Sequence, residues 1–472
     1  MALTIHGTTS AVALISDTNN VGLGTNAVDS ITTGDHNTGI GVNSLTANTE
    51  GSSNVAMGRE SLDANTTGSE NTGIGYQALT SNTTASNNVA IGNKALQQNT
   101  TATNNTSVGN EALKANTTGG NNTAVGRIAL LSNTTGATNT AVGSQALQNN
   151  TTASNNVAVG VEAMVTNTTG GNNTSVGSEA LSANTTGSGN CSLGRQALNN
   201  NTTAAENSAL GLYALYANST GSYNCAIGSG ALLSNTTAGN NTAIGYKALN
   251  LNTTGADNVG IGYQALESVT TGTHNIGIGH RTGDYQTTLT TGNFNILIGG
   301  YCHTNSVSAG RQIVMGDSVV GSADNSLTIG NGGTDSAIVF GQTSWTTPSD
   351  VRLKEDIQDA EAGLDFINAL RPVTYKWKKE KDIPKELHTH KEGSEKRFNN
   401  DYTNHGFIAQ EVKEAIDNHP EIKDGFEMWR EDGLDGRQRI GEGALVTILT
   451  KAVQELSAQN TALAARITTL EG

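Results

Sequence analysis

The chain has 472 residues, of which 57 are glycine and only 4% are aromatic, and it carries a formal net charge of −15. This composition is poor material for one large hydrophobic core, so we expect an elongated or repetitive body. The formal net charge, counted as Lys and Arg minus Asp and Glu, is 8 − 17 = −9 for the residues before Asp350. It is 18 − 24 = −6 from Asp350 to the end. Neither part has the basic surface of a nucleic-acid-binding protein.

Residues 1–19 contain neither a basic start nor an apolar run long enough for a signal peptide, and no transmembrane stretch follows. We therefore expect synthesis and folding in a cytoplasm, without membrane insertion, and we predict that residues 1–19 attach to another protein. The cysteines, Cys191, Cys225 and Cys302, are far apart in the sequence. They fit neither a disulfide framework nor a zinc site, so we interpret them as reduced packing residues.

Residues 20–283 repeat with a period of 17. Glycine recurs in sixteen consecutive units from Gly24 to Gly279, each time directly preceded by Leu, Ile, Val or Met and, four positions before the glycine, by Asn. Thirteen consecutive units carry a second Asn seven positions after the glycine, from Asn48 to Asn252. The unit N-x-x-[ILVM]-G-x-x-A-L-x-x-N-T-T-G-x-x has two short apolar clusters between polar turns. This pattern predicts stacked parallel β-coils and a mainly β fold.

We expect the apolar side chains to point into the coil and the asparagines to stack at its corners, bonded from coil to coil. At a strand spacing of ~4.8 Å, sixteen coils would form a shaft of roughly 75–80 Å. One thin coil buries little area, which favours association of several copies. The N-T-A-[IV]-G motif resembles the repeat of trimeric bacterial adhesin heads, which are β-rolls. The resemblance implies a homotrimeric shaft, as a β-roll or a triple β-helix, with handedness and strand exchange open.

The repeat loosens after Gly279, and the intervals to the next glycines first lengthen and then shorten steadily, at Gly299, Gly316, Gly330 and Gly341. We predict that residues 284–349 form irregular β-coils that taper toward a triple β-helix. The unusual side chains at 280–285 and 301–303 would form either a binding tip or loops that accommodate the change of geometry.

Other interpretations of the repeats have less support. Residues 260–265 match a dinucleotide pattern, G-x-G-x-x-A, but so short a repeat has no room for the strand and helix that this motif needs. The Asn-Thr-Thr triplets are better explained as turn residues than as glycosylation sites or an ice-binding surface. Carboxylates do not pair at a recurring position, which argues against a glycosidase. We expect no cofactor and no metal, and His388 and His390 to be simply exposed.

Residues 350–472 have the pattern of a small α+β domain. We predict a helix at 360–369, a strand at 373–377, a charged loop at 378–402, a helix ending near 418–420 and a hairpin at 427–440. A long helix over 442–470 carries a coiled-coil seam of residues spaced by three and four, namely Leu449, Val453, Leu456, Asn460, Leu463, Ile467 and Leu470. The simple rule for parallel coiled coils favours two strands, whereas the shaft favours three, and we favour the trimer.

Three motifs of this second part stand in a fixed order: S-D-x-R-L-K at 349–354, A-L-R-P-V-x-Y-K-W at 369–377 and H-G-F-I-A-Q-E-V at 405–412. They resemble the intramolecular chaperone auto-processing domain that ends many bacteriophage tail fibres and tailspikes. The resemblance implies a domain that trimerises, drives folding of the β-helix before it, and then cuts itself off by Ser-Lys chemistry at a Ser-Asp bond. The matching residues are Ser349, Asp350 and Lys354.

Such cleavage needs a base that takes the serine proton, and a lysine can serve where burial favours its neutral amine. Attack by Ser349 on its own carbonyl would close a strained four-membered ring. We therefore hypothesise that water activated by Lys354, or a group from a neighbouring chain, attacks the bond between Ser349 and Asp350. We interpret His405 as a packing or hydrogen-bonding residue and not as a catalyst.

These features predict a homotrimeric phage tail fibre of the virion that attaches to other tail or baseplate proteins and binds a host-surface glycan or protein. Its enzyme activity would be single-turnover self-cleavage, with no outside substrate. One alternative is a bacterial trimeric surface adhesin, which the missing signal peptide disfavours. Another is a polysaccharide-depolymerising tailspike, which would need a carboxylate-lined groove in the repeats.

Overall fold

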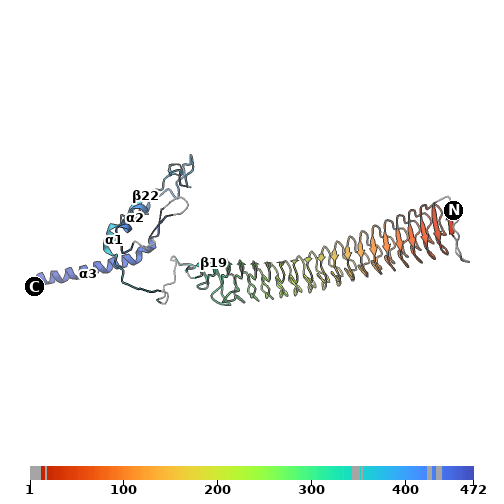
Figure 1. Ribbon diagram of the computed structural model, residues 1–472, viewed down its shortest axis with the longest axis horizontal. Coiled ribbons are helices and arrows are strands. Elements are labelled where there is room, and N and C mark those ends of the chain that lie inside the picture. The colour runs from red at the N-terminus through yellow and green to blue at the C-terminus, as the bar shows by residue number, and fades with distance from the viewer. Residues whose placement is uncertain are drawn as a thin grey trace. The chain divides into compact units, whose positions relative to one another are not determined.

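The computed structural model describes residues 12–15, 19–332, 334–342, 351, 354–387, 389–422, 428–431 and 438–471. The chain divides into two compact units, Met1–Pro348 and Ser349–Gly472. In the first unit a stack of coils runs from the red N-terminal strands to the green strand β19 (Figure 1).

The first unit is a β-solenoid in which each coil contributes one short strand. Strand β1 (Val12–Ile15) pairs antiparallel with β2 (Asn20–Leu23), and each strand from β2 to β19 then pairs in parallel with the next one in the sequence. Up to β17 each strand residue pairs with the residue exactly one period further along the chain, as Val157 pairs with Thr174. The predicted parallel β-coil and its period are confirmed.

The later strands of this unit are β3 (Thr38–Ile40), β4 (Val55–Met57), β5 (Thr72–Ile74), β6 (Val89–Ile91), β7 (Thr106–Val108), β8 (Thr123–Val125), β9 (Thr140–Val142), β10 (Val157–Val159), β11 (Thr174–Val176), β12 (Cys191–Leu193), β13 (Ser208–Leu210), β14 (Cys225–Ile227), β15 (Thr242–Ile244), β16 (Val259–Ile261), β17 (Ile276–Ile278), β18 (Ile296–Ile298), β19 (Gln312–Asp317), β20 (Ser326–Asn331) and β21 (Thr334–Val339).

Alternation along each strand decides what the coil buries. In β6 the middle residue, Ala90, is fully buried, whereas Ile91 is 38% exposed on the outer side. The expectation that this apolar cluster points inward is therefore wrong. The Asn before each strand faces inward, and the period of two then directs the first and third strand residues outward. Cys191, the first residue of β12, is exposed for the same reason and is not a packing residue, whereas Cys302 is buried.

The second apolar cluster fills the core of the solenoid. Ala129 and Leu130 are fully buried and belong to a continuous cluster of Ala and Leu side chains that stack from coil to coil. Leu130 has a φ of 51°, in the left-handed region, and its N–H donates to the carbonyl of Ala146 in the next coil at 3.0 Å. The left-handed conformation costs about 1–2 kcal/mol. Burial of a leucine side chain contributes about 1.5–3 kcal/mol, which offsets this strain.

Two ladders of buried asparagines hold neighbouring coils together. In the first ladder, Nδ2 of Asn139 donates to the carbonyl of Ala153 at 2.9 Å. In the second, Nδ2 of Asn133 donates to Oδ1 of Asn116 and to the carbonyl of Gly136, both at 2.9 Å. The predicted coil-to-coil amide bonding is confirmed, and each such bond contributes about 1 kcal/mol net.

The glycine that marks the period is required by the backbone. Gly126 has a φ of 139°, which side chains rarely allow. A Cβ atom at this position would lie 2.4 Å from the carbonyl oxygen of Gly143 in the next coil. Coils therefore approach one another too closely at this corner for any residue but glycine.

The coils become irregular after β17. Ile276 of β17 pairs with Ile296 of β18, which is a longer step than one period. The step returns to one period between Ile296 and Ile313 of β19, and it is shorter between Ile313 and Leu327 of β20. Strand β21 then runs antiparallel to β20, so the last glycine of the series does not begin another parallel coil, and this part of the predicted taper is wrong. Residues 343–349 lie outside the described residues, and the triple β-helix stays a prediction.

The second unit contains three α-helices within the described residues, α1 (Leu364–Ala369), α2 (Ala409–Asp417) and α3 (Leu445–Glu471). Two antiparallel strand pairs accompany them, β22 (Val373–Tyr375) with β23 (Asn404–Gly406) and β24 (Trp429–Glu431) with β25 (Gln438–Ile440). Short 3₁₀ turns lie at Glu380–Asp382 and Glu442–Ala444.

The small α+β domain of the prediction is confirmed with shorter elements. The first helix begins at Leu364 instead of 360, and the first strand ends at Tyr375. The hairpin is present as β24 and β25, and its predicted turn lies outside the described residues. Phe366 is fully buried at the centre of the core. The Glu455 carboxylate of α3 accepts the N–H of Leu364 at 2.9 Å, which fixes α3 to the start of α1.

The structure offers no membrane-spanning segment among its described helices, since none is both long enough and apolar enough to cross a bilayer.

Candidate cleavage and assembly site

The predicted cleavage chemistry rests on three residues at the start of the second unit. Ser349 and Asp350 lie outside the described residues, so of these three residues the structure describes Lys354 alone. Lys354 is exposed, and its backbone N–H donates to the carbonyl of Val351 at 3.2 Å. A lysine amine acts as a base only where burial favours its neutral form. The single chain therefore does not hold Lys354 in the environment that the reaction needs.

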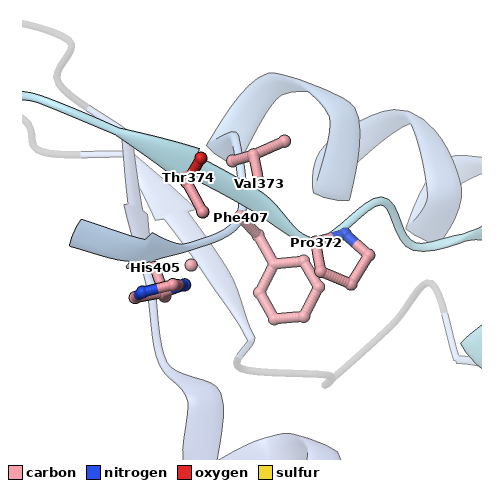
Figure 2. A pocket seen from close by; sticks show the side chains of 6 residues that line it. Pro372, Val373, Thr374, His405 and Phe407 are labelled. Carbon is pink, nitrogen blue, oxygen red and sulfur yellow. The ribbon is translucent and has the colours of Figure 1, made fainter. Parts of the chain in front are cut away.

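The other two motifs meet in space as strands β22 and β23. Thr374 of the first motif lies opposite His405 of the second in antiparallel register. Figure 2 shows the labelled side chains around the pocket, with Thr374 and His405 carried by different strands. The pocket is lined by Pro372, Val373, Thr374, His405, Gly406 and Phe407.

His405 does not have the predicted packing role within one chain. Its side chain is exposed on β23, and among the described residues it takes part in no hydrogen bond that would fix the ring. The middle residue of so short an edge strand projects away from the paired backbone, which explains this exposure. The imidazole therefore lines an open pocket between the two motifs.

Strand β22 is anchored by aromatic contacts that follow it in the sequence. The ring of Trp377 makes edge contacts with Tyr375 and Phe398, in both cases at 5.3 Å between centroids. Nε1 of Trp377 is buried and has no acceptor among the described residues. The ring is therefore held by packing, which positions the preceding strand beside β23.

The charged loop after β22 is more ordered than a solvated loop. The carboxylate of Glu380 is buried and accepts hydrogen bonds from Ser394 at 2.8 Å and Lys391 at 3.0 Å, which lower its pKa. Nδ1 of His390 lies 2.8 Å from the carbonyl oxygen of Ile383, and its side chain is only 14% exposed. The expectation that His390 is simply exposed is wrong, and His388 lies outside the described residues.

Helix α3 has a buried beginning and an exposed remainder. Leu445, Ile448 and Ala452 are buried against the core of the domain. The predicted seam beyond them is exposed in the single chain, by 64% at Val453 and 53% at Leu463. A shallow groove lined by residues 453–464 follows this face. Within the described part of the chain, the helix therefore exposes an apolar surface over most of its length.

One group of side chains among the described residues has the composition of a metal site. Ligand atoms of Asp365, His419 and Glu421 all lie within 4.8 Å of one another. Both carboxylates are exposed, and Asp365 already accepts the N–H of Phe366 at 2.9 Å. Nδ1 of His419 lies 2.7 Å from the carbonyl oxygen of Ala415. These contacts give the group a structural role at the ends of α1 and α2.

Comparison with known proteins supports the resemblance seen in the second unit. Residues 349–419 match a peptidase family described as chaperone of endosialidase. No curated protein and no solved structure matches the chain. The matched segment begins at Ser349 and contains the three motifs. Together with the long β-solenoid before it, this match fits a phage tail fibre or tailspike with a C-terminal chaperone domain.

Proposed function

We propose that the protein is a homotrimeric tail fibre that binds the host surface, folds with the help of its C-terminal unit and then releases that unit by cleavage between Ser349 and Asp350. The exposed seam of α3 is the observation that carries the proposal. Leu456 and Ile467 are 48% and 47% exposed, and Leu470 is 85% exposed. An apolar seam with heptad spacing is stabilised when other helices cover it.

The solenoid carries a second apolar surface that supports self-association. The outward residues before the glycines form a stripe from β2 to β20, in which Leu23, Leu210 and Ile329 are 39%, 43% and 44% exposed. We call it the outward stripe. Its side chains recur once per coil, so a second copy aligned alongside would cover them along the whole shaft. The resemblance to trimeric adhesin heads favours three copies over the two that the seam rule favours.

Cleavage in this proposal depends on assembly. Lys354 is exposed in the single chain, and packing of neighbouring chains would supply the burial that favours its neutral amine. Water, deprotonated by that amine, adds to the Ser349 carbonyl; if a hydroxyl of a neighbouring chain adds instead, water then hydrolyses the ester that forms. The bond to the Asp350 nitrogen then breaks, and the leaving amine takes up the proton.

The test compares full-length protein with Ser349→Ala on gels run with and without boiling, and with mass measurement by light scattering. We expect the wild type to yield a trimer of the segment 1–349 and a released second unit. If the attacking group is the Ser349 hydroxyl of a neighbouring chain, Ser349→Ala should remain a trimer of the uncut chain, whereas attack by water would still cut this variant. A monomeric or dimeric mass would overturn the trimer, and a wild type that stays uncut would overturn cleavage. Thr347→Ala is the matched control and should be cut normally.

Cys191 gives an independent test of the outward stripe. It is exposed on the outer side of β12, and Ser208 occupies the same position in the next coil. A short bis-maleimide should therefore link chains covalently in the wild type, and Cys191→Ser should suppress this linkage without disturbing the coil. Absence of covalent dimers from a trimeric fibre would show that another face is at the axis.

A further inference from the structure

Aromatic side chains gather in one column near the C-terminal end of the solenoid. Tyr246, Tyr263 and His280 each follow the period-marking glycine of their own coil. The ring centroids of Tyr246 and Tyr263 are 5.4 Å apart, and those of Tyr263 and His280 are 5.0 Å apart, with interplanar angles of 19° and 7°. Tyr301 continues the column with an edge contact to His280 at 4.9 Å, and Tyr285 contacts Tyr301 at 5.0 Å. We call these five residues the aromatic column.

The coil fold does not require these rings. Tyr246 and Tyr263 are 44% and 46% exposed. Other coils place a small polar residue at the same position, as at Ser144, Ser178 and Ser229. Exposed aromatic surface that the fold does not use is typical of a binding site.

The aromatic column differs from the outward stripe in extent. The stripe is aliphatic and recurs in nearly every coil, as a surface between parallel copies of the chain must. The rings of the aromatic column lie on the consecutive coils from Tyr246 to Tyr301. A contact that is local along the shaft fits a ligand of limited length better than a neighbouring chain.

The charges beside the aromatic column compensate one another. Nζ of Lys247 lies 3.8 Å from Oε1 of Glu267, and Arg281 lies 4.0 Å from the carboxylate of Asp284. Nε2 of Gln264 donates to Glu267 at 2.5 Å. The surface therefore offers hydrogen-bonding groups without a net charge, which suits an uncharged polar ligand better than an acidic one.

We propose that the aromatic column binds a neutral glycan chain. The stacked rings cover one another's faces, so the apolar C–H groups of pyranose rings would contact the exposed ring edges, while the tyrosine hydroxyls and the paired side chains of Gln264 and Glu267 bond to sugar hydroxyls. The distance between neighbouring ring centroids along the shaft is about the size of one sugar ring. This inference rests on the proposed host-binding function and names its ligand class. Three copies of the column on one fibre would raise a weak affinity through multivalency.

The test replaces the rings by the residue that other coils carry. Tyr246→Ser with Tyr263→Ser removes the centre of the column, and Tyr76→Ser is the matched control, because Tyr76 follows a period-marking glycine far from it. The probes are cellohexaose, maltohexaose and chitohexaose as neutral glycans and polysialic acid as an acidic one. Binding to full-length protein is measured by saturation-transfer NMR and by titration.

We expect wild type and Tyr76→Ser to transfer saturation to the C–H protons of at least one neutral glycan, and the double variant to bind it at least tenfold more weakly. Transfer to none of the neutral glycans, equal binding by all three proteins, or binding of polysialic acid alone would overturn the proposal.

Unboiled gels and adsorption to host cells separate this inference from the proposed function. If the double variant loses its trimer, the column is a contact between chains, and the glycan proposal is overturned while the fibre stands. A wild type that is trimeric and adsorbs to cells, but binds no neutral glycan, has the same consequence. A wild type that neither trimerises nor adsorbs to cells refutes the proposed function itself.

Discussion

Replacing one asparagine of the first ladder tests what holds the coils together. Asn139 is fully buried, and its side chain makes three hydrogen bonds. Nδ2 donates to Oδ1 of Asn122 at 3.2 Å and to the carbonyl of Ala153 at 2.9 Å, and Oδ1 accepts the N–H of Asn156 at 3.0 Å. Asn139→Ala removes all three. At about 1 kcal/mol net for each, the local free energy of opening should fall by ~3 kcal/mol per chain.

The measurement must be local, because a stack of repeats does not unfold in one two-state step. Native-state hydrogen exchange reads the N–H of Asn156 directly, since the substitution removes its acceptor. A loss of ~3 kcal/mol corresponds to exchange about a hundredfold faster, because about 1.4 kcal/mol is a factor of ten. Asn93→Ala is the control, because Asn93 is exposed on the same solenoid. If both variants exchange alike at Asn156, the ladder does not stabilise the stack.

Three further predictions concern the second unit. Leu463→Glu places a charge in the exposed seam and should weaken self-association at least tenfold in light scattering, whereas Ala465→Glu, outside the seam, should not; equal effects would refute the coiled coil. Lys354→Arg keeps the charge but cannot act as a base, so the fibre should assemble uncut on gels, and normal cutting would exclude Lys354 as the base. Hydrogen bonds from Lys379 and a second lysine lower the pKa of Glu395 to about 2. Their stabilisation should be present above about pH 4.5 and be lost as the pH falls toward 2, and an NMR titration midpoint near 4.5 would contradict this.

The repeat allowed the sequence to predict the solenoid, because identical residues at a fixed period must have identical surroundings. The asparagine ladders and the parallel register follow from that symmetry. The direction of the strand residues could not be predicted in the same way, because a buried Asn is unusual and apolar residues are ordinarily assumed to be inside. Once Asn88 is known to be buried, alternation directs Val89 outward, Ala90 inward and Ile91 outward.

The candidate site was only partly predictable for a different reason. The motifs named Ser349 and Lys354, but sequence spacing does not show which segments meet. The pairing of β22 with β23 places Thr374 opposite His405 across the whole charged loop. Strand β23 consists of Asn-His-Gly alone and therefore has no apolar alternation that would indicate a strand. The sequence placed His280, Tyr285 and Tyr301 in segments that would form either a binding tip or loops, but it did not join Tyr246 and Tyr263 to them, because these residues become neighbours only when the coils stack.

In the proposed trimer, the near-identity of the coils means that the regular part of the shaft cannot by itself define how neighbouring chains align. If one chain slips by a single coil against another, the outward stripe meets the same kinds of side chain and loses only the contacts of that coil. The irregular coils between β17 and β20 remove this equivalence, because they differ in length from one to the next and a slipped chain no longer matches. These coils immediately precede the second unit in the sequence. Assembly that begins at the C-terminal unit would therefore fix the alignment where it is unique, before the equivalent coils associate. Cleavage after assembly would then remove the unit that begins assembly. A cut fibre that unfolds could not refold by the same route.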